Sequence, residues 1–121
     1  MIRIPKTRSK YGNVKTVIDD ITFDSHLEAR RYMEIKMLKS AGEIIAFEVH
    51  PEFMLQESFK HGGKTIRAIT YTGDFLLVYP DGHRVIEDTK GFMTEPSKIR
   101  IKLLLKRYPD IEFRLVKKVR R

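Results

Sequence analysis

The sequence predicts a mixed α/β fold in which a mixed β-sheet is flanked by helices. The first observation is a stretch at residues 71–90 that reads as two strands joined by a turn at Pro80-Asp81-Gly82. The second is a pair of helical patterns, one from about His26 to Ser40 and one that ends near Arg107. The third is the row of short β-rich segments between them, which gives the order hairpin, helix, four strands, helix, strand. Helices and strands in this order pack as layers around one core.

The composition is that of a single domain without cysteine. The 121 residues are enough to bury a core, and no Pro- or Gly-rich linker marks a domain boundary. Without cysteine, neither a disulfide framework nor a thiolate zinc site is possible. No apolar run approaches the roughly 18 to 20 residues that cross a bilayer. We therefore expect a soluble, cytosolic protein with no membrane partner.

Positive charge is concentrated at the two ends of the chain, and the formal net charge is +8. Residues 1–15 contain five basic side chains and no acid, and residues 98–121 contain ten against two acids. This asymmetry favours a polyanionic partner, above all nucleic acid, although solubility is the plain alternative. We expect residues 1–13 to form a flexible basic arm, and Arg8, Lys10 and Lys15 to follow a phosphate backbone.

The segment before residue 43 predicts a hairpin followed by a helix. Residues 16–23 carry β-branched side chains on both sides of Asp19-Asp20, which indicates a short hairpin or a bent strand. The helix is expected to start after Ser25 and to end at Gly42. Ser25 and Glu28 have the spacing of a capping box, so Glu28 is either a helix cap or an acid of the candidate site. Apolar residues around most of this helix predict burial on more than one side.

The middle of the chain predicts strands and one loop. Residues 43–56 read as a strand, a break at His50-Pro51 and a second strand, because proline cannot donate to a central ladder. Residues 58–64 are expected to form a polar, mobile loop. A second helix should start near Thr94, with proline in its first turn, and residues 111–119 should form a closing strand.

The second helix has two predicted faces. One is a basic ridge that recurs every four residues, and it consists of Lys98, Lys102 and Lys106. The other is apolar and consists of Ile101, Leu104, Leu105 and Tyr108. A charge run is most often a solvated stripe, but this one begins close to the end of the central hairpin.

The turn at Pro80-Asp81-Gly82 sets the pairing of the central hairpin. If these three residues form the loop, Tyr79 faces His83 and Asp74 lies across from Asp88. Two carboxylates then share one face of the hairpin. Like charges that oppose each other on a sheet are destabilising, and a divalent metal ion with oxygen ligands would relieve the repulsion.

Lys90 points to the same face as Asp88, because side chains alternate along a strand. The predicted result is a small pocket with two acids and one amine. Two alternatives remain open. A two-residue loop would shift the pairing by one residue and separate the acids, and an Asp-x-Lys pair can simply be a solvated surface.

The motifs, in their order along the chain, resemble those of the PD-(D/E)XK nuclease superfamily. They are Glu28 within FDSHLEARRY, Asp74 within YTGDF, and Asp88 and Lys90 within VIEDTKG. The sequence looks most like small phage-encoded members, over roughly residues 11–116. The resemblance implies a restriction-endonuclease-like core and the metal-dependent hydrolysis of phosphodiester bonds in DNA.

By this resemblance, Asp74 and Asp88 bind Mg²⁺ or Mn²⁺ and Glu28 assists them from the helix. Lys90 would polarise the attacking water or the scissile phosphate, and Lys98 and Lys102 would hold the DNA backbone. The residue types suit the chemistry, because carboxylate oxygens bind hard cations and an ammonium stabilises developing negative charge.

Two positions depart from the superfamily pattern. Gly73 stands where a proline often precedes the first aspartate, and an additional acid, Glu87, precedes Asp88. Alternation along the strand favours Asp88 as the ligand, because it shares a face with Lys90.

The resemblance also implies a substrate class. Small phage and archaeal relatives include Holliday-junction resolvases that act as homodimers in a bacterial or phage-infected cytoplasm. A small basic chain without a separate reading module fits recognition of DNA shape and backbone. We expect a nuclease for branched DNA; the alternatives are a general DNA-end or single-strand nuclease, and a DNA-binding module that does not cut.

Overall fold

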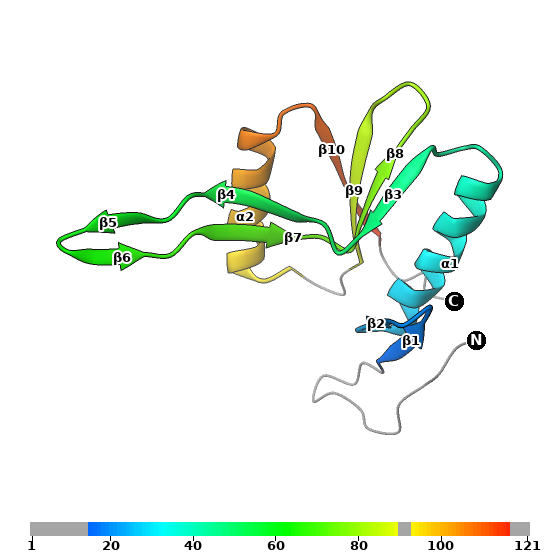
Figure 1. Ribbon diagram of the computed structural model, residues 1–121, viewed down its shortest axis with the longest axis horizontal. Coiled ribbons are helices and arrows are strands. Elements are labelled where there is room, and N and C mark those ends of the chain that lie inside the picture. Colours follow the sequence, from blue (N-terminus) through cyan, green and yellow to red (C-terminus); the bar gives the residue numbers. More distant parts are fainter. Residues whose placement is uncertain (1–14, 90–92, 117–121) are drawn as a thin grey trace. The chain divides into compact units, whose positions relative to one another are not determined.

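The computed structural model describes residues 15–89 and 93–116. They form two helices and ten strands, which confirms the mixed α/β class (Figure 1). The chain divides into two compact units, one up to Glu43 and one from Ile44 onward. No helix in the described ranges is long and apolar enough to cross a membrane.

The first unit begins with the predicted hairpin. Strand β1 (Thr16–Ile18) pairs antiparallel with β2 (Ile21–Phe23), and Asp19 and Asp20 form the two-residue turn at φ angles of 53° and 62°. Two positive φ angles are typical of a type I′ turn, which matches the twist of the flanking strands. The Asp19 carboxylate accepts hydrogen bonds from the Tyr32 hydroxyl at 2.7 Å and the Lys36 ammonium at 2.6 Å, so the turn is fastened to the following helix.

Helix α1 (His26–Ser40) begins and ends as its sequence predicts. The Ser25 hydroxyl caps the first turn by accepting from the Glu28 amide. At the other end, the amide of Gly42 donates to the Lys39 carbonyl, and the amide of Glu43 donates to the Leu38 carbonyl. This is a Schellman motif, and Gly42 supplies its left-handed residue at φ 79°.

Burial on helix α1 differs from the prediction. The buried side chains form one stripe, made of Glu28, Ala29, Tyr32 and Ile35. Met33 and Met37 are 42% and 70% exposed. The prediction of burial on more than one side is wrong because methionine counts as apolar in a sequence pattern, whereas its flexible side chain also tolerates a position in solvent.

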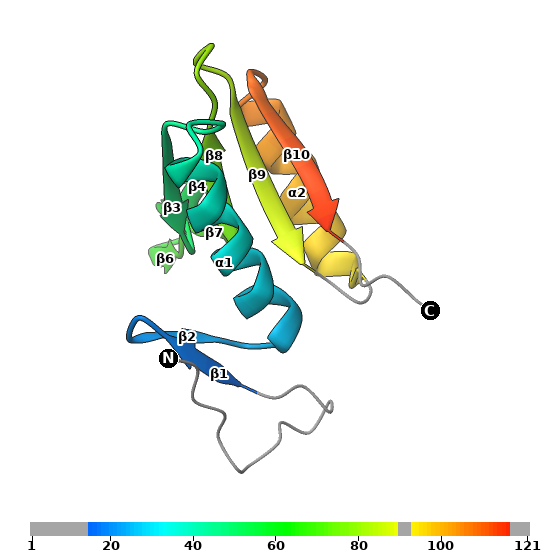
Figure 2. The same ribbon diagram turned by 90° about the vertical axis from the view of Figure 1, so that its right-hand side faces the viewer.

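The second unit contains a four-stranded mixed sheet in the order β10, β9, β8, β3. Its strands are β3 (Ala46–Val49), β8 (Phe75–Val78), β9 (Arg84–Thr89) and β10 (Ile111–Val116). Neighbours are antiparallel except β9 and β10, which run side by side in parallel (Figure 2). Parallel strands need a crossover, and here helix α2 (Glu95–Arg107) provides it.

The other strands of this unit form a long ribbon outside the four-stranded sheet. They are β4 (Glu52–Gln56), β5 (Phe59–His61), β6 (Lys64–Ile66) and β7 (Ile69–Thr72). The break at His50-Pro51 is confirmed, and it lies opposite Gly73 and Asp74: the His50 amide donates to the Asp74 carbonyl and the Gly73 amide to the Pro51 carbonyl. The pairing register is the same on both sides of this break. The chain from β3 to β8 is therefore one hairpin with a bend.

This arrangement corrects two predictions. The middle strands do not share one sheet, because His50 adopts a φ of 54° and Pro51 has no amide hydrogen, so the ribbon turns away from the sheet. Residues 58–64 are not a loop, since β5 and β6 pair across a two-residue turn. Gly62 and Gly63 form that turn at φ 57° and 80°, as a type I′ turn requires.

Helix α2 covers the ribbon and the sheet of the second unit. Thr94 caps it by accepting from the Ser97 amide, and Pro96 lies in its first turn, as predicted. Its buried residues Ile101 and Leu104 belong to a core with Phe53, Leu55, Tyr71, Ile86 and Ile111. Leu105, predicted for the same face, is 43% exposed because it lies on the flank of the helix. The predicted closing strand is confirmed up to Val116, and the rest of it lies outside the described residues.

Candidate active site

The central hairpin has the predicted register. Phe75 pairs with Glu87, and the Tyr79 amide donates to the His83 carbonyl at 3.0 Å. Residues 80–82 are therefore the loop, with Gly82 at φ 92°. The alternative two-residue loop is excluded. Asp74 lies one position beyond the last ladder pair, where its amide donates to the Glu87 carbonyl at 3.1 Å.

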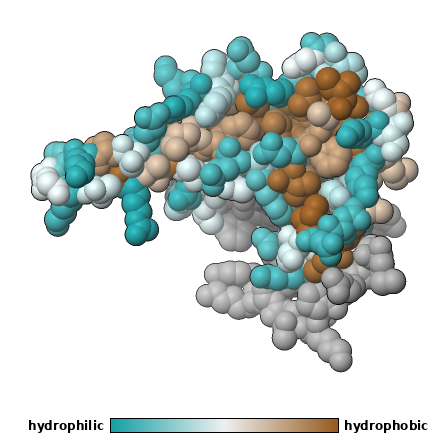
Figure 3. Space-filling view, viewed as in Figure 1, coloured by the Kyte–Doolittle hydropathy of each residue, from teal (hydrophilic) through white to brown (hydrophobic). Residues whose placement is uncertain are grey.

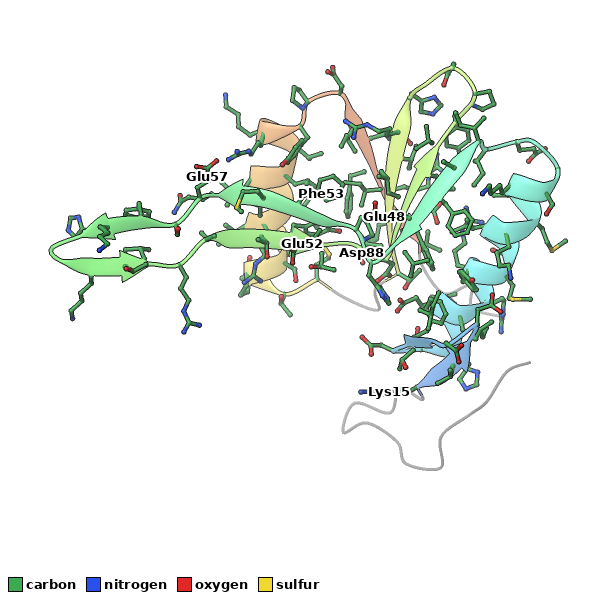
Figure 4. All side chains as sticks on the ribbon, viewed as in Figure 1. Lys15, Glu48, Glu52, Phe53, Glu57 and Asp88 are labelled. Atoms are coloured by element: carbon green, nitrogen blue, oxygen red, sulfur yellow. The ribbon has the colours of Figure 1, made fainter. Side chains whose placement is uncertain are left out.

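Asp88 is almost fully buried, at 1% exposure, at the end of β9. The Tyr71 hydroxyl donates to its Oδ2 at 2.8 Å. Figure 4 shows Asp88 where β7 and β9 come together. Burial raises the pKa of Tyr71 far above its usual value, and the charges of Asp88 and Asp74 raise it further. Asp88 therefore accepts from the Tyr71 hydroxyl directly, whereas Asp74 acts on that hydroxyl through its charge alone.

Asp74 is held by Thr89, the residue between Asp88 and Lys90. Its Oδ2 accepts from the Thr89 amide at 2.5 Å and from the Thr89 hydroxyl at 2.6 Å. These bonds fix the carboxylate against the end of β9 at the point where the ladder stops. Lys90 itself lies outside the described residues, so its place in the pocket stays a prediction.

Gly73 occupies a position that has no room for a larger side chain. A Cβ at this position would lie 3.0 Å from Ile86 Cγ2 and 3.2 Å from Tyr71 Cε2. In addition, its amide donates to the Pro51 carbonyl, a bond that proline could not make. The close approach lets Tyr71 reach Asp88.

Glu87 faces the other side of the sheet. It is fully buried, shares its face with the paired Phe75, and its Oε2 lies 3.5 Å from the guanidinium of Arg114 on β10. Because neighbouring side chains on a strand alternate, Glu87 and Asp88 cannot both belong to the pocket with Tyr71. The structure therefore assigns Asp88 to that pocket.

Glu28 belongs to the first unit, and its amide takes part in the helix cap. Its side chain is buried at 4% exposure. A role of this side chain as a third acid stays a prediction. Among residues 15–89 and 93–116, no three His, Asp or Glu side chains are grouped so that they could hold a metal ion.

Two carboxylates are nevertheless a suitable donor set for one particular class of cation. Mg²⁺ typically keeps several waters and binds through one or two carboxylates plus substrate phosphate. Asp74 is partly exposed and Asp88 is almost fully buried, and both offer hard oxygen donors. Such a pair fits Mg²⁺ better than Zn²⁺, whose protein sites usually combine three or four His, Cys and carboxylate ligands.

A groove of about 410 Å³ lies beside Tyr71. Its lining consists of residues 68–72 on β7 with Ser97 and Arg100 on α2. Tyr71 is shared, since it lines the groove and bonds Asp88. Hydroxyl groups and one guanidinium suit a phosphate-bearing ligand.

Arg100 and Tyr71 were not among the predicted site residues. Lys98 and Lys102 are exposed on α2 but lie two positions from Arg100, which is about 200° around the helix. The groove therefore faces Arg100, whereas the predicted basic ridge lies on the far side of α2. A four-residue lysine repeat is conspicuous in the sequence, and a single arginine beside it is not. Lys15 is exposed, and Arg8 and Lys10 lie outside the described residues.

Comparisons with known proteins give one finding. A family model described as "Protein of unknown function (DUF1064)" matches residues 8–121. No curated protein and no solved structure matched the chain.

Proposed function

The chain belongs to the DUF1064 family, and we propose that it is a metal-dependent DNA endonuclease with a restriction-endonuclease-like core. The observation that carries the proposal is a pair of carboxylates at the end of β9, Asp88 held by the Tyr71 hydroxyl and Asp74 held by Thr89, with Tyr71 also lining a polar groove. Two carboxylates, each fixed by a hydroxyl near the end of β9, supply the oxygen donors that a hard divalent cation requires.

In the proposed site, Asp74 and Asp88 would hold Mg²⁺ or Mn²⁺. A bound divalent cation lowers the pKa of its water and offsets charge on the reacting phosphate. The chain's own groups prepare the ligands: the Tyr71 hydroxyl orients Asp88, and Thr89 fixes Asp74. Lys90 would stabilise negative charge at the phosphate. Glu28 remains the candidate for a third acid by the resemblance alone.

The groove supports DNA as the substrate. Arg100 would bind a phosphate of the strand to be cut, and the Ser97 hydroxyl could accept or donate beside it. The net charge of +8 supports binding to a polyanion. We place the protein in the cytoplasm of a bacterial or phage-infected cell, and propose branched DNA cut by a homodimer.

A cleavage assay tests the proposal. The protein is incubated with a labelled four-way junction, a linear duplex and a single strand, in Mg²⁺, Mn²⁺ or EDTA. Paired nicks in the junction alone support a resolvase, and cutting of all three supports a general nuclease. Band shifts without cutting would refute catalysis and leave a DNA-binding module.

Variants separate catalysis from binding. Asp88→Asn and Lys90→Ala should abolish cleavage while DNA affinity changes little, because they alter the reacting site and leave the outer surface intact. Asp110→Asn is the matched control, since it removes an exposed carboxylate outside the groove. If Asp88→Asn cuts as fast as Asp110→Asn, the assignment of the site is wrong.

A further inference from the structure

The end of the ribbon is a basic hairpin that the proposed active site does not use. We call residues 58–67 the tip hairpin; they include β5, the Gly62-Gly63 turn and β6. Every residue in this range is exposed, and the ribbon extends away from α2 and the sheet of its own unit (Figure 1). Figure 3 shows mostly hydrophilic side chains at its free end.

The charges of the tip hairpin have one sign. Lys60, Lys64 and Arg67 are basic, and no acid occurs between residues 58 and 73. The acid nearest to this range on β4's side, Glu57, lies 3.7 Å from Arg107 of α2. The tip hairpin thus carries basic side chains and contains no acidic side chain that could pair with them.

The pairing distributes the side chains over both faces of the tip hairpin. Phe59 pairs with Ile66 and His61 with Lys64, so these four share one face, while Lys60 lies on the other. Phe59 and Ile66 are 46% and 39% exposed. A flat acidic surface could contact the basic side chains on only one face of the tip hairpin. A groove with negatively charged walls on both sides could contact the basic side chains on both faces.

We infer that the tip hairpin lies in the major groove of duplex DNA and holds the duplex beyond the candidate active site. The major groove of B-DNA, about 12 Å wide, admits a two-stranded ribbon, and the minor groove, about 6 Å wide, does not. The deep, narrow major groove of an RNA duplex excludes it as well. On the face with Lys64, Phe59 and Ile66 can contact thymine methyl groups.

The ribbon also fixes how far from the cut the contact lies. From Tyr71 to Lys64 the chain runs seven residues along the ribbon, which span about 23 Å at 3.3 Å per residue. One DNA strand advances about 3.4 Å per nucleotide. The tip hairpin should therefore contact DNA up to about seven nucleotides from the phosphate beside Tyr71, with the groove of Arg100 on the way. This distance rests on the proposed function.

Binding experiments in EDTA test the inference without cleavage. Affinity for a labelled DNA duplex of about 30 base pairs, some three helical turns, is measured by fluorescence anisotropy against salt concentration. The double variant Lys60→Ala/Lys64→Ala should lower the slope of log affinity against log salt by about two, and affinity about 30-fold near 0.15 M salt. Affinity for an RNA duplex should not depend on these lysines.

The control variant removes the same charge elsewhere. Arg30→Ala/Arg84→Ala alters two exposed residues, one on α1 and one at the start of β9, away from its Asp88 end. It should change the slope by less than one. Equal losses in the two double variants, or no loss in the tip variant, would overturn the inference. Circular dichroism checks that both variants remain folded.

A second measurement locates the tip hairpin on DNA. Because the chain has no cysteine, His61→Cys carries a single site for a tethered iron-EDTA reagent. Cuts by the reagent about seven nucleotides from the enzyme's own nick support the inference, and cuts beside the nick refute it. If the protein binds through the tip but never nicks, the proposed function fails while the tip assignment stands. If the protein nicks DNA and the tip variant binds normally, the tip assignment fails while the proposed function stands.

Discussion

The hydrogen bond from Tyr71 to Asp88 gives the sharpest test of the site's construction. It is 2.8 Å long and buried, and its acceptor is a carboxylate. Hydrogen bonds to charged groups contribute about 1.5–3 kcal/mol, and burial makes the loss of a donor costly. Tyr71→Phe keeps the ring in the core and removes only the hydroxyl. We expect this variant to lose about 1.5–3 kcal/mol in the free energy of unfolding.

The loss is measured by urea unfolding in EDTA. Far-UV circular dichroism is the suitable signal, because the chain has no tryptophan. With an m value near 2 kcal/mol per molar urea, the midpoint should fall by about 1 M. Tyr108→Phe is the matched control: its hydroxyl donates to the Met54 carbonyl at 3.0 Å in an exposed setting. A neutral bond of that kind is expected to contribute about 0.5–1 kcal/mol.

A double-mutant cycle with Asp88→Asn isolates the pair. In the Asp88→Asn background the hydroxyl of Tyr71 donates to a neutral amide oxygen, so its removal should cost about 1 kcal/mol less than in the native chain. The reasoning is refuted if Tyr71→Phe costs no more than Tyr108→Phe, or if the cycle shows no coupling. Either result would mean that the carboxylate does not depend on this hydroxyl.

Two further predictions concern other parts of the chain. Gly73→Ala should destabilise the protein by about 1–3 kcal/mol in urea unfolding and slow any DNA cleavage, because the new Cβ would lie 3.0 Å from Ile86 and push Tyr71 from its place; an unchanged midpoint would contradict the close approach. Lys36→Met should raise the pKa of Asp19, which Lys36 and then Tyr32 hold below its usual value. A carboxyl whose pKa is depressed in the folded state stabilises the fold at pH values above its unfolded-state pKa, and this stabilisation is lost as the pH falls. The stability difference between the native protein and the variant should therefore shrink in acid. Carbon NMR titration of the Asp19 carboxyl measures the shift, and a pKa equal in both proteins would exclude the contact.

Local sequence chemistry was sufficient for the elements that carry their own end signals. Ser25 and Gly42 set the ends of α1, and Pro80 with Gly82 set a three-residue loop, which in turn fixed the register of the central hairpin. Each of these residues acts on its nearest neighbours through backbone angles or caps, so no distant contact was needed to set the register of the hairpin.

The remaining features depend on contacts that a linear pattern does not contain. Gly62-Gly63 is a turn signal for a hairpin, but the polar residues on both sides of it indicated a loop. The tip hairpin has no buried face, so its strands lack the alternation of apolar and polar residues that predicts a strand. Tyr71 looked like an ordinary core residue of a strand, and only its approach past Gly73 reveals a bond to Asp88. Arg100 gains its position from the packing of α2 on β7.

The ion pair between Glu87 and Arg114 bears on how the last strand finds its place. These residues are side-by-side partners in the parallel pair of β9 and β10. If β10 slid by two residues, Glu87 would meet either Glu112, a second negative charge, or Val116, which has no charge. Arg114 is 42% exposed, so water screens the pair, but the buried carboxylate still favours a neighbouring cation over an acid or an apolar side chain. The pair therefore favours one alignment of the final strand over its two nearest alternatives.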